Sequence, residues 1–500
     1  MMKVKLGGGA RVARARGAGA PALLVAAAVV VSAVVLFATA SHRAKPVETW
    51  AYTYGQEDED DQLTSIRPTR DGGFIAVGSI VDRKIEEPGL RDAWALKLRS
   101  DGSVQWQYAY KMKGLSPLRP DRYFMDGFSD MIELPEGDFI ATGATEGQAW
   151  LLRTDKTGRP KWLSFYPSPG LGSGLGSIIA TNDGNFLAVG SIYGAQNDPT
   201  YNGAIWIFRF NENGNAVSSK AYVGPRHPSV TNVVETPQGG TLLAVRIEAT
   251  MEGQRWGLWL LELREDGTTE WSRFYSGLGF SEARVVHHPN DDGMTLFAIR
   301  DIPETEPELK YLGRTRGQRI VLGLDAEGNL LWTKAHDSSD RTKFRPWARE
   351  ALSMPAGTVL LVGSVMQNVL RGDSHGKASP DVGWLAELDP EKGFLASRAF
   401  RLGDTTTLTG ALADQQGIVA LGSSDIMEGA LVMRLGNDLS FSRPCKMDVQ
   451  GLPDMTVSPV APMDLKPEDL DVKVVDMEAV GEPKEVAVFK LPIKSKKVCG

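Results

Sequence analysis

The chain has 500 residues, of which 42% are hydrophobic and 23% charged, and its 54 glycines and 28 prolines punctuate strand-like segments without forming low-complexity tracts. The first 40 residues contain five of the 55 basic residues and no acidic one. Residues 41–500 therefore carry 50 basic and 62 acidic residues, a net charge of −12. This balance argues against nucleic acid or an anionic membrane surface as partner.

Residues 1–40 have the pattern of a targeting segment. Basic residues precede the apolar run Leu23–Phe37, and Ala38-Thr39-Ala40 fits a small-x-small cleavage site. Two interpretations stay open: a cleaved signal peptide, or an uncleaved transmembrane helix over residues 21–40 with a cytoplasmic N-terminus. Either one places the chain from Ser41 onward in the periplasm or outside the cell, with membrane contact only through residues 21–40.

From residue 47 onward, one unit of about 56 residues recurs, and its best copy is Asp71–Tyr110. An apolar run closing on glycine, such as Phe74–Gly78, is followed by an alternating strand that carries a tryptophan, such as Trp94. A turn glycine and a second alternating strand with two aromatic residues four apart complete the unit. The fourth-strand positions begin at residues 50, 106, 162, 218, 271, 332, 396 and 441, including three equal spacings of 56 residues.

A period of this size with about four strand signals per copy is typical of a propeller blade. We therefore predict an all-β fold: a seven-bladed β-propeller of four-stranded blades over residues 47–445. There are eight fourth-strand signals for seven blades, so either Val47–Tyr54 or Leu439–Cys445 completes the last blade. Residues 446–500 lack the repeat and are interpreted as a short C-terminal appendage packed against the propeller.

The strand before each hairpin turn is expected to be innermost and to line the central channel. Counting back from the turns gives one channel position per blade. The polar candidates for binding at these positions are Asp130, Asn232, Arg284 and Glu350, of which Arg284 needs a one-residue insertion to align. Arg246 and Arg300 stand in place of the repeat's glycine in blades four and five and are expected to add positive charge near one end of the channel. Long insertions in the loops are a second candidate binding region.

Motifs for catalysis or metal binding are not found in the sequence. The six histidines form no His-Glu-x-x-His pattern, and the only two cysteines, Cys445 and Cys499, form no Cys-x-x-Cys pattern. No metal site and no cofactor is therefore predicted.

The repeat resembles the blades of exported bacterial β-propeller proteins related to quinoprotein-like propellers. Its Gly-x-x-x-Trp element, for example Gly102 and Trp106, is similar to the tryptophan-docking element of quinoprotein dehydrogenases. Those enzymes typically add quinone-binding residues, calcium-binding residues and often vicinal cysteines. The present chain has no adjacent cysteines.

Two functions follow as hypotheses. The first is an exported, non-enzymatic propeller that binds a protein or glycan of the cell envelope through its loops or channel mouth. The alternative is an enzyme that uses the channel mouth, either a quinone-dependent oxidoreductase or a polysaccharide lyase or hydrolase. A convergent acid/base set would discriminate between them, and the sequence offers Asp130 and Glu350 without an evident His or Tyr partner. It does not indicate the oligomeric state.

Cys445 and Cys499 are predicted to form a disulfide. They are the only cysteines, and export places them in a compartment where disulfides persist. Cys445 occupies the position that Tyr54 and Tyr110 hold in other copies of the repeat, and Cys499 is the penultimate residue. Their pairing would tie the C-terminal residues to the end of the propeller.

Overall fold

The computed structural model describes residues 48–500 apart from a set of connecting segments. These segments are 57–60, 82–90, 113–126, 146, 168–171, 194–202, 225–227, 237, 248–256, 277–279, 289–292, 304–314, 339–343, 368–380, 426–428, 450–454, 460–467, 470–472, 478 and 491–493. The targeting segment of residues 1–40 lies outside the described residues. Within the described ranges, no helix has the length and hydropathy needed to cross a membrane.

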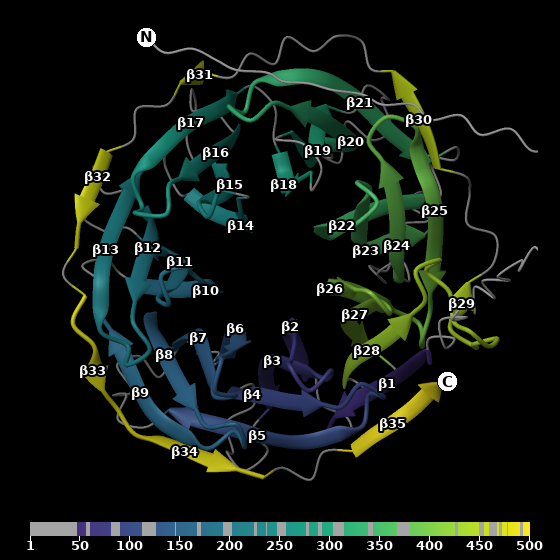
Figure 1. Cartoon of the computed structure of the whole chain (residues 1–500). Helices are drawn as coiled ribbons and strands as arrows, with labels where there is room; N and C mark the ends of the chain where they lie inside the picture. The colour runs from purple at the N-terminus through teal and green to yellow at the C-terminus, as the bar shows by residue number, and fades with distance from the viewer. Residues whose placement is uncertain are drawn as a thin grey trace, which may run out of the picture. The chain divides into compact units, whose positions relative to one another are not determined.

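Residues Val47–Gly500 form one compact unit that contains seven antiparallel sheets arranged in a ring, which confirms the seven-bladed propeller (Figure 1). The innermost strands are β2 (Gln62–Pro68), β6 (Gly127–Glu133), β10 (Gly172–Ala180), β14 (Pro228–Glu235), β18 (Phe280–His287), β22 (Phe344–Ser353) and β26 (Thr406–Asp414). The second strands are β3 (Phe74–Val81), β7 (Phe139–Thr145), β11 (Phe186–Tyr193), β15 (Thr241–Ile247), β19 (Met294–Pro303), β23 (Val359–Gln367) and β27 (Gly417–Ser424).

The third strands carry the tryptophan column, and most of their described residues are buried. They are β4 (Arg91–Leu98), β8 (Gln148–Thr154), β12 (Ala204–Phe210), β16 (Gly257–Leu263), β20 (Thr315–Leu324), β24 (Asp381–Asp389) and β28 (Gly429–Leu435). Trp94, Trp150, Trp206, Trp259 and Trp384 are all at most 1% exposed. Large rings fill the wedge-shaped space between blades, so each core cluster draws on two adjacent sheets.

The fourth strands are β5 (Val104–Met112), β9 (Pro160–Tyr166), β13 (Ala216–Val223), β17 (Thr269–Ser276), β21 (Leu330–Ser338) and β25 (Gly393–Phe400). In blade 7 this place is taken by β1 (Trp50–Gly55), which pairs antiparallel with β28 from Trp50 opposite Arg434 to Tyr54 opposite Ala430. The N-terminal strand therefore closes the ring, which resolves the choice that the repeat count left open. The competing segment, Leu439–Cys445, forms no strand.

In five of the blades, a tyrosine of the fourth strand donates a hydrogen bond to the turn glycine of the next blade. Trp106 packs on the turn glycine Gly158, where an added Cβ would lie 2.9 Å from the indole, and the Tyr110 hydroxyl donates to the Gly158 carbonyl at 2.8 Å. Gly158 has φ +82°, a conformation that favours glycine. The same hydroxyl bond joins Tyr54 to Gly102 and Tyr166 to Gly214, each at 2.6 Å.

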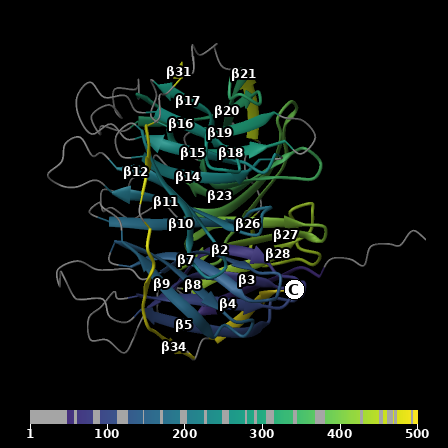
Figure 2. The same cartoon turned by 60° about the vertical axis from the view of Figure 1, so that its left-hand side comes forward.

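The C-terminal residues add a fifth strand to every blade. We call residues 446–500 the C-terminal belt; its strands are β29 (Asp448–Val449), β30 (Met455–Pro459), β31 (Glu468–Asp469), β32 (Lys473–Asp476), β33 (Glu482–Pro483), β34 (Val486–Phe489) and β35 (Lys494–Cys499). In that order they pair with the fourth strands of blades 6, 5, 4, 3, 2, 1 and 7. The belt thus runs once around the rim, opposite to the order of the blades (Figures 1 and 2).

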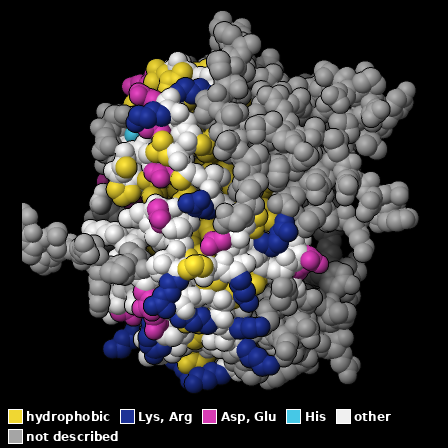
Figure 3. All heavy atoms as spheres, turned by 90° about the vertical axis from the view of Figure 1, so that its right-hand side faces the viewer, with side chains coloured by type: hydrophobic (Ala, Val, Ile, Leu, Met, Phe, Trp, Pro, Cys, Tyr) yellow, Lys and Arg dark blue, Asp and Glu magenta, His cyan; other side chains and the backbone are white. Residues whose placement is uncertain are grey.

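The belt matters because the fourth strands would otherwise be exposed sheet edges, which invite pairing with other chains. The outermost edge of blade 7 is now β35, and its lysines Lys494, Lys496 and Lys497 are exposed. Figure 3 shows the rim from the right-hand side of Figure 1, with Lys and Arg side chains gathered toward its lower part. Charged edge positions of this kind discourage further strand addition.

Candidate functional site

A β-bulge sets the channel-lining position in each innermost strand. In blade 1 the register shifts between Leu63 and Ser65, and in blade 2 it shifts between Phe128 and Asp130. Blades 3, 4, 6 and 7 repeat this shift directly before Ser177, Asn232, Glu350 and Gly410. The extra residue bends the strand and re-aims the side chain that follows. The structure therefore places the expected channel positions at one equivalent point of the ring.

These inner strands enclose a cavity of about 1010 Å³. All seven blades contribute to its lining, and the polar candidates among the lining residues are Asp130, Asn232 and Glu350. Arg284 occupies the matching register in blade 5, opposite Phe297, although the bulge there falls earlier, between Phe280 and Ala283. Its side chain does not line the cavity: its Nε donates to the Arg349 carbonyl at 2.6 Å and its Nη1 to the Ala283 carbonyl at 2.8 Å.

Asp130 is a buried carboxylate surrounded by donors from three blades. Ser65 donates to Oδ1 at 2.6 Å, and Arg67 binds both oxygens, through Nε at 3.0 Å and Nη2 at 2.6 Å. On the other side, the Ile178 amide donates to Oδ2 at 3.2 Å. Burial alone raises the pKa of Asp130, but the Arg67 guanidinium and these hydrogen bonds outweigh burial and hold the pKa below its usual range.

Arg67 is a charged residue of the cavity lining that the sequence did not single out. It lies two positions beyond the channel column on β2, where the other blades carry aliphatic residues such as Ile132, Ile179 and Val234. The signal was present in the sequence, because a period of two along a strand places Ser65 and Arg67 on the same face. Its side chain is 40% exposed, whereas that of its partner Asp130 is 3% exposed. Arg67 therefore adds a cation to the cavity wall.

Asn232 plays the same part between blades 4 and 5 that Asp130 plays between blades 2 and 3. Its Oδ1 accepts a hydrogen bond from the Val285 amide at 3.0 Å. The bulge hydroxyl next to it, Thr231, donates to the Ala283 carbonyl of blade 5 at 2.9 Å, as Thr64 does to the Phe128 carbonyl of blade 2 at 2.8 Å. Asp130 and Asn232 are thus engaged in fastening neighbouring blades.

Glu350 is differently placed. Its Oε1 accepts a hydrogen bond from its neighbour Ala351 at 3.0 Å, and this is the one hydrogen bond to its carboxyl from the part of the chain that the structure describes. Burial raises the pKa of Glu350, although Arg284 and Arg67 oppose the shift. Blade 7 lies between the blades of Glu350 and Arg67 in the ring (Figure 1), and its residues in the cavity lining are Gly410, Ala411 and Leu421, none of which is charged or polar in its side chain.

Arg246 is not among the residues that line this cavity. The register puts Val245 opposite Trp259, the place that Gly78 holds opposite Trp94, so Arg246 follows the glycine position and does not replace it. In blade 5, Ala298 stands opposite Ile320 and Arg300 follows two residues later on β19. The side chain of Arg300 is not among those described.

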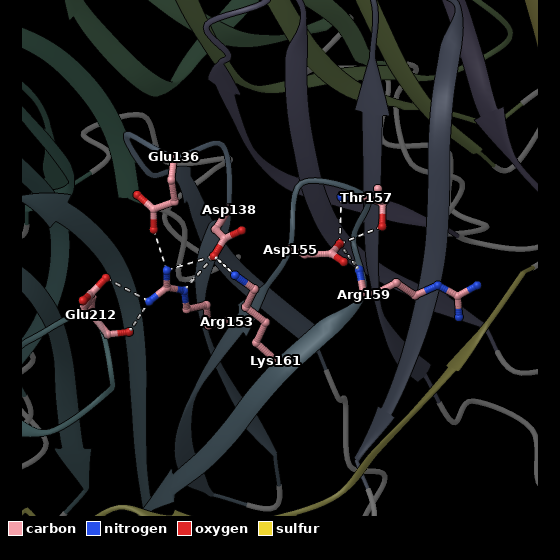
Figure 4. A network of polar contacts seen from close by, with 8 residues as sticks. All are labelled: Glu136, Asp138, Arg153, Asp155, Thr157, Arg159, Lys161 and Glu212. Atoms are coloured by element: carbon pink, nitrogen blue, oxygen red, sulfur yellow. Dashed lines mark hydrogen bonds and ion pairs between the residues drawn. The ribbon is translucent and has the colours of Figure 1, made fainter.

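A second polar cluster joins blades 2 and 3 away from the channel (Figure 4). Arg153 on β8 is 8% exposed, and its guanidinium binds Asp138 at 2.8 Å and Glu212 of the next blade at 3.1 Å. Lys161 also pairs with Asp138. Since these charges are paired with one another, we assign the cluster to blade packing. Among the described residues, no group of three or more His, Cys, Asp or Glu side chains is placed to hold a metal ion.

No protein-family model and no curated protein matches the chain. Among solved structures it is similar to puromycin hydrolase, with 14% identity and a TM-score of 0.44 over 80% of this chain and 57% of that one. The chain thus spans little more than half the length of puromycin hydrolase. The PQQ domain of pyranose dehydrogenase from Coprinopsis cinerea matches with 11% identity and a TM-score of 0.33, over 77% of this chain and 95% of that one. A Synechocystis apocarotenoid oxygenase mutant matches with 12% identity and a TM-score of 0.42, over 83% and 93%.

Proposed function

We propose that this propeller is an exported, non-enzymatic binding protein whose channel recognises a polar group of a cell-envelope partner, a glycan or a protein segment. One observation carries the proposal: the inner strands of all seven blades line a single cavity of about 1010 Å³, into which Arg67 and Glu350 bring charge. That volume lies at the upper end of the range for small-molecule pockets, so it suits part of a chain and not a folded protein. The other polar column residues, Asp130 and Asn232, keep the wall rigid.

Export is supported by the targeting pattern of residues 1–40 together with the disulfide between Cys445 and Cys499. Cell fractionation tests it, since recovery of the protein in the cytoplasm would contradict export. N-terminal sequencing of the exported protein then separates cleavage, which gives a first residue Ser41, from anchoring.

Channel binding is tested by filling the cavity without removing any existing contact. Gly410 suits this purpose: a Cβ added there would meet only the Leu421 side chain, at an ordinary 3.5 Å. Wild-type and Gly410→Leu proteins are titrated with envelope glycans and with envelope peptides. We expect the substituted protein to fold and to lose at least tenfold in affinity, a difference of about 1.4 kcal/mol. If the wild-type and Gly410→Leu proteins bind with equal affinity, the binding site lies in the loops and not in the channel.

A second candidate, an enzyme at the channel mouth, is favoured by one observation, the raised pKa of Glu350. A carboxylic acid that keeps its proton to higher pH than usual is suited to general-acid catalysis. The other carboxylate, Asp130, is held by Arg67 and buried donors, which suits a positioning role. Mass spectrometry of a bound glycan after prolonged incubation distinguishes the two candidate functions. If the wild-type protein cleaves the glycan and the Glu350→Gln variant does not, the protein is an enzyme and the binding-protein proposal is wrong.

A further inference from the structure

The lining of the channel divides into groups that are already engaged and groups that are available. Asp130 and Asn232 bind backbone amides of the next blade. Arg67 uses Nε and Nη2 on Asp130, and within the described residues its Nη1 makes no hydrogen bond. Glu350 uses Oε1 on the Ala351 amide, and its Oε2 likewise makes none there. The available pair is therefore one guanidinium edge and one carboxyl oxygen.

Between this pair, the channel position of blade 7 is Gly410, which has no side chain, and the other lining residues of blade 7 are the apolar Ala411 and Leu421. In the order of the ring, β22 carries Glu350, β26 carries Gly410 and β2 carries Arg67, and Figure 1 shows β26 between the other two around the channel. All three residues line the same cavity. A ligand group seated over Gly410 meets a cation on one side and a carboxyl group on the other.

The rest of the lining is rich in hydroxyl groups and includes one exposed aromatic ring. Ser65, Ser177 and Thr231 already donate to Asp130 or to backbone carbonyls, and the cavity is further lined by the hydroxyl-bearing residues Ser191, Ser229 and Ser353. Tyr193, at the end of β11 in blade 3, also lines the cavity and is 61% exposed. Hydroxyls that hydrogen-bond and a ring that offers an apolar face with a polar tip complement a sugar, which has polar edges and apolar faces.

We infer that the channel binds an acidic glycan by seating a uronic-acid carboxylate over Gly410, between the free guanidinium edge of Arg67 and the free carboxyl oxygen of Glu350. In this arrangement Arg67 donates to one carboxylate oxygen, and Glu350 donates to the other when it carries a proton. This inference rests on the proposed channel-binding function and names its ligand. A guanidinium is well matched to a carboxylate, and a hydrogen bond to an ionised oxygen is stronger than a neutral one. With Glu350 ionised, the same position would set two carboxylates against each other. Ligand binding is therefore coupled to a proton held on Glu350.

Other charged groups bear on this pH dependence and must be separated from Glu350. Arg67 on β2, Asp130 on β6 and Arg284 on β18 all interact with Glu350. Glu235 on β14, and His287 and His288 at the end of β18, line the cavity as well. A histidine that gains a proton as the pH falls would also attract an anionic sugar. Substituting Glu350 alone distinguishes the two causes.

Calorimetric titration with an oligosaccharide of uronic acid, and with its methyl ester as the matched neutral ligand, tests the inference. In acidic solution, where Glu350 is protonated and the uronic acid is ionised, we expect the acid to bind the wild-type protein about tenfold more tightly than the ester, and to lose about that factor as the pH rises through the pKa of Glu350. Glu350→Gln mimics the protonated carboxyl, so it should bind the acid in alkaline solution as tightly as the wild type does in acidic solution. Gly410→Leu should weaken both ligands.

The outcomes separate this inference from the function on which it rests. Equal binding of acid and ester, both weakened by Gly410→Leu, would overturn the carboxylate inference and leave channel binding standing. A pH dependence that persists in Glu350→Gln would assign the proton to a histidine and overturn the role of Glu350. If a peptide with a free C-terminal carboxylate binds more tightly than any uronic-acid oligosaccharide, the inference that the ligand is a glycan is wrong. Binding of every ligand unaffected by Gly410→Leu would overturn the channel site itself.

Discussion

Cys445 and Cys499 are joined by a disulfide, with their Cα atoms 5.6 Å apart across 54 positions of sequence. Cys445 directly precedes the first belt strand, on blade 6, and Cys499 lies opposite Ala51 on the strand that closes blade 7. Between them the belt pairs with all seven blades. The bond therefore turns the belt into a covalent ring around the propeller, and the predicted disulfide is confirmed with a wider reach than the sequence indicated.

Opening this ring is expected to lower stability. A cross-link that closes a loop of 54 residues contributes about 4 kcal/mol in the chain-entropy account. Cys445→Ser/Cys499→Ser protein should lose about that much in denaturant unfolding, and amide exchange should rise first in β29–β35 and in β1. Reduction of the wild type is the matched control. Unchanged exchange in the belt after reduction would show that strand pairing alone holds it.

Without the belt, the protein should self-associate. Deletion of residues 446–500, with Cys445→Ser to avoid a free thiol, exposes the outer edges of the fourth strands, from β5 to β25 and β1. Such edges pair with other chains. Size-exclusion chromatography with light scattering should show larger species, while the full-length double serine variant keeps the wild-type size. A truncated protein of unchanged association state would contradict the edge-protection role.

Each hydrogen bond from a fourth-strand tyrosine to the turn glycine of the next blade, here called a tyrosine clamp, should make a measurable contribution to stability. Tyr110→Phe removes the hydroxyl that donates to the Gly158 carbonyl and leaves that carbonyl buried without its partner. We expect a loss of about 1 kcal/mol in the free energy of unfolding. Tyr193→Phe is the control, because the Tyr193 side chain is exposed and lies outside the clamps. Equal effects of the two substitutions would contradict the clamp.

Asp130 should make stability depend on pH in a defined direction. Its pKa is lower in the folded protein than in the unfolded chain, so its contribution is present above the unfolded pKa and is lost as the pH falls through the folded pKa. Asp130→Asn should cost about 2 kcal/mol at neutral pH, since the Arg67 guanidinium loses a charged partner. Denaturant unfolding of both proteins from neutral to strongly acidic pH should show this gap narrow. If the difference in the free energy of unfolding between the two proteins grows as the pH falls, the folded pKa of Asp130 is not lowered and the prediction is wrong.

Glu350 should act in the opposite direction. Because burial raises its folded pKa, ionisation favours the unfolded chain, so stability declines as the pH rises from the unfolded pKa through the folded one. Glu350→Gln should therefore be more stable than the wild type in mildly alkaline solution and equal to it in acid. Thermal unfolding at the two ends of this range checks the sign, and a variant that is less stable at alkaline pH would contradict it.

The sequence by itself determined the blade number, the tryptophan and turn-glycine columns, the channel position in each inner strand and the pairing of Cys445 with Cys499. These features repeat at a fixed period or depend on residue type alone. A pattern seen in one copy of the repeat can therefore be checked against the other copies. The aromatic residues four apart also marked the fourth strands, because a strand places alternate residues on one face. Their hydrogen bonds to the turn glycines of the next blade were not predicted and are seen only in the structure.

Only the tertiary structure decided how the ring closes, where the C-terminal residues run and which channel groups are engaged. The belt strands are as short as two residues, as in β31 and β33, so no sequence period marks them. Their partners lie from 48 positions away, for Asp448 and Phe400, to 448 positions away, for Cys499 and Ala51. Arg67 and Asp130 are 63 positions apart on different blades and meet because the bulges set their strands in register. Strand pairing at such separations is fixed by the backbone hydrogen bonds of the closed ring, which local composition does not encode.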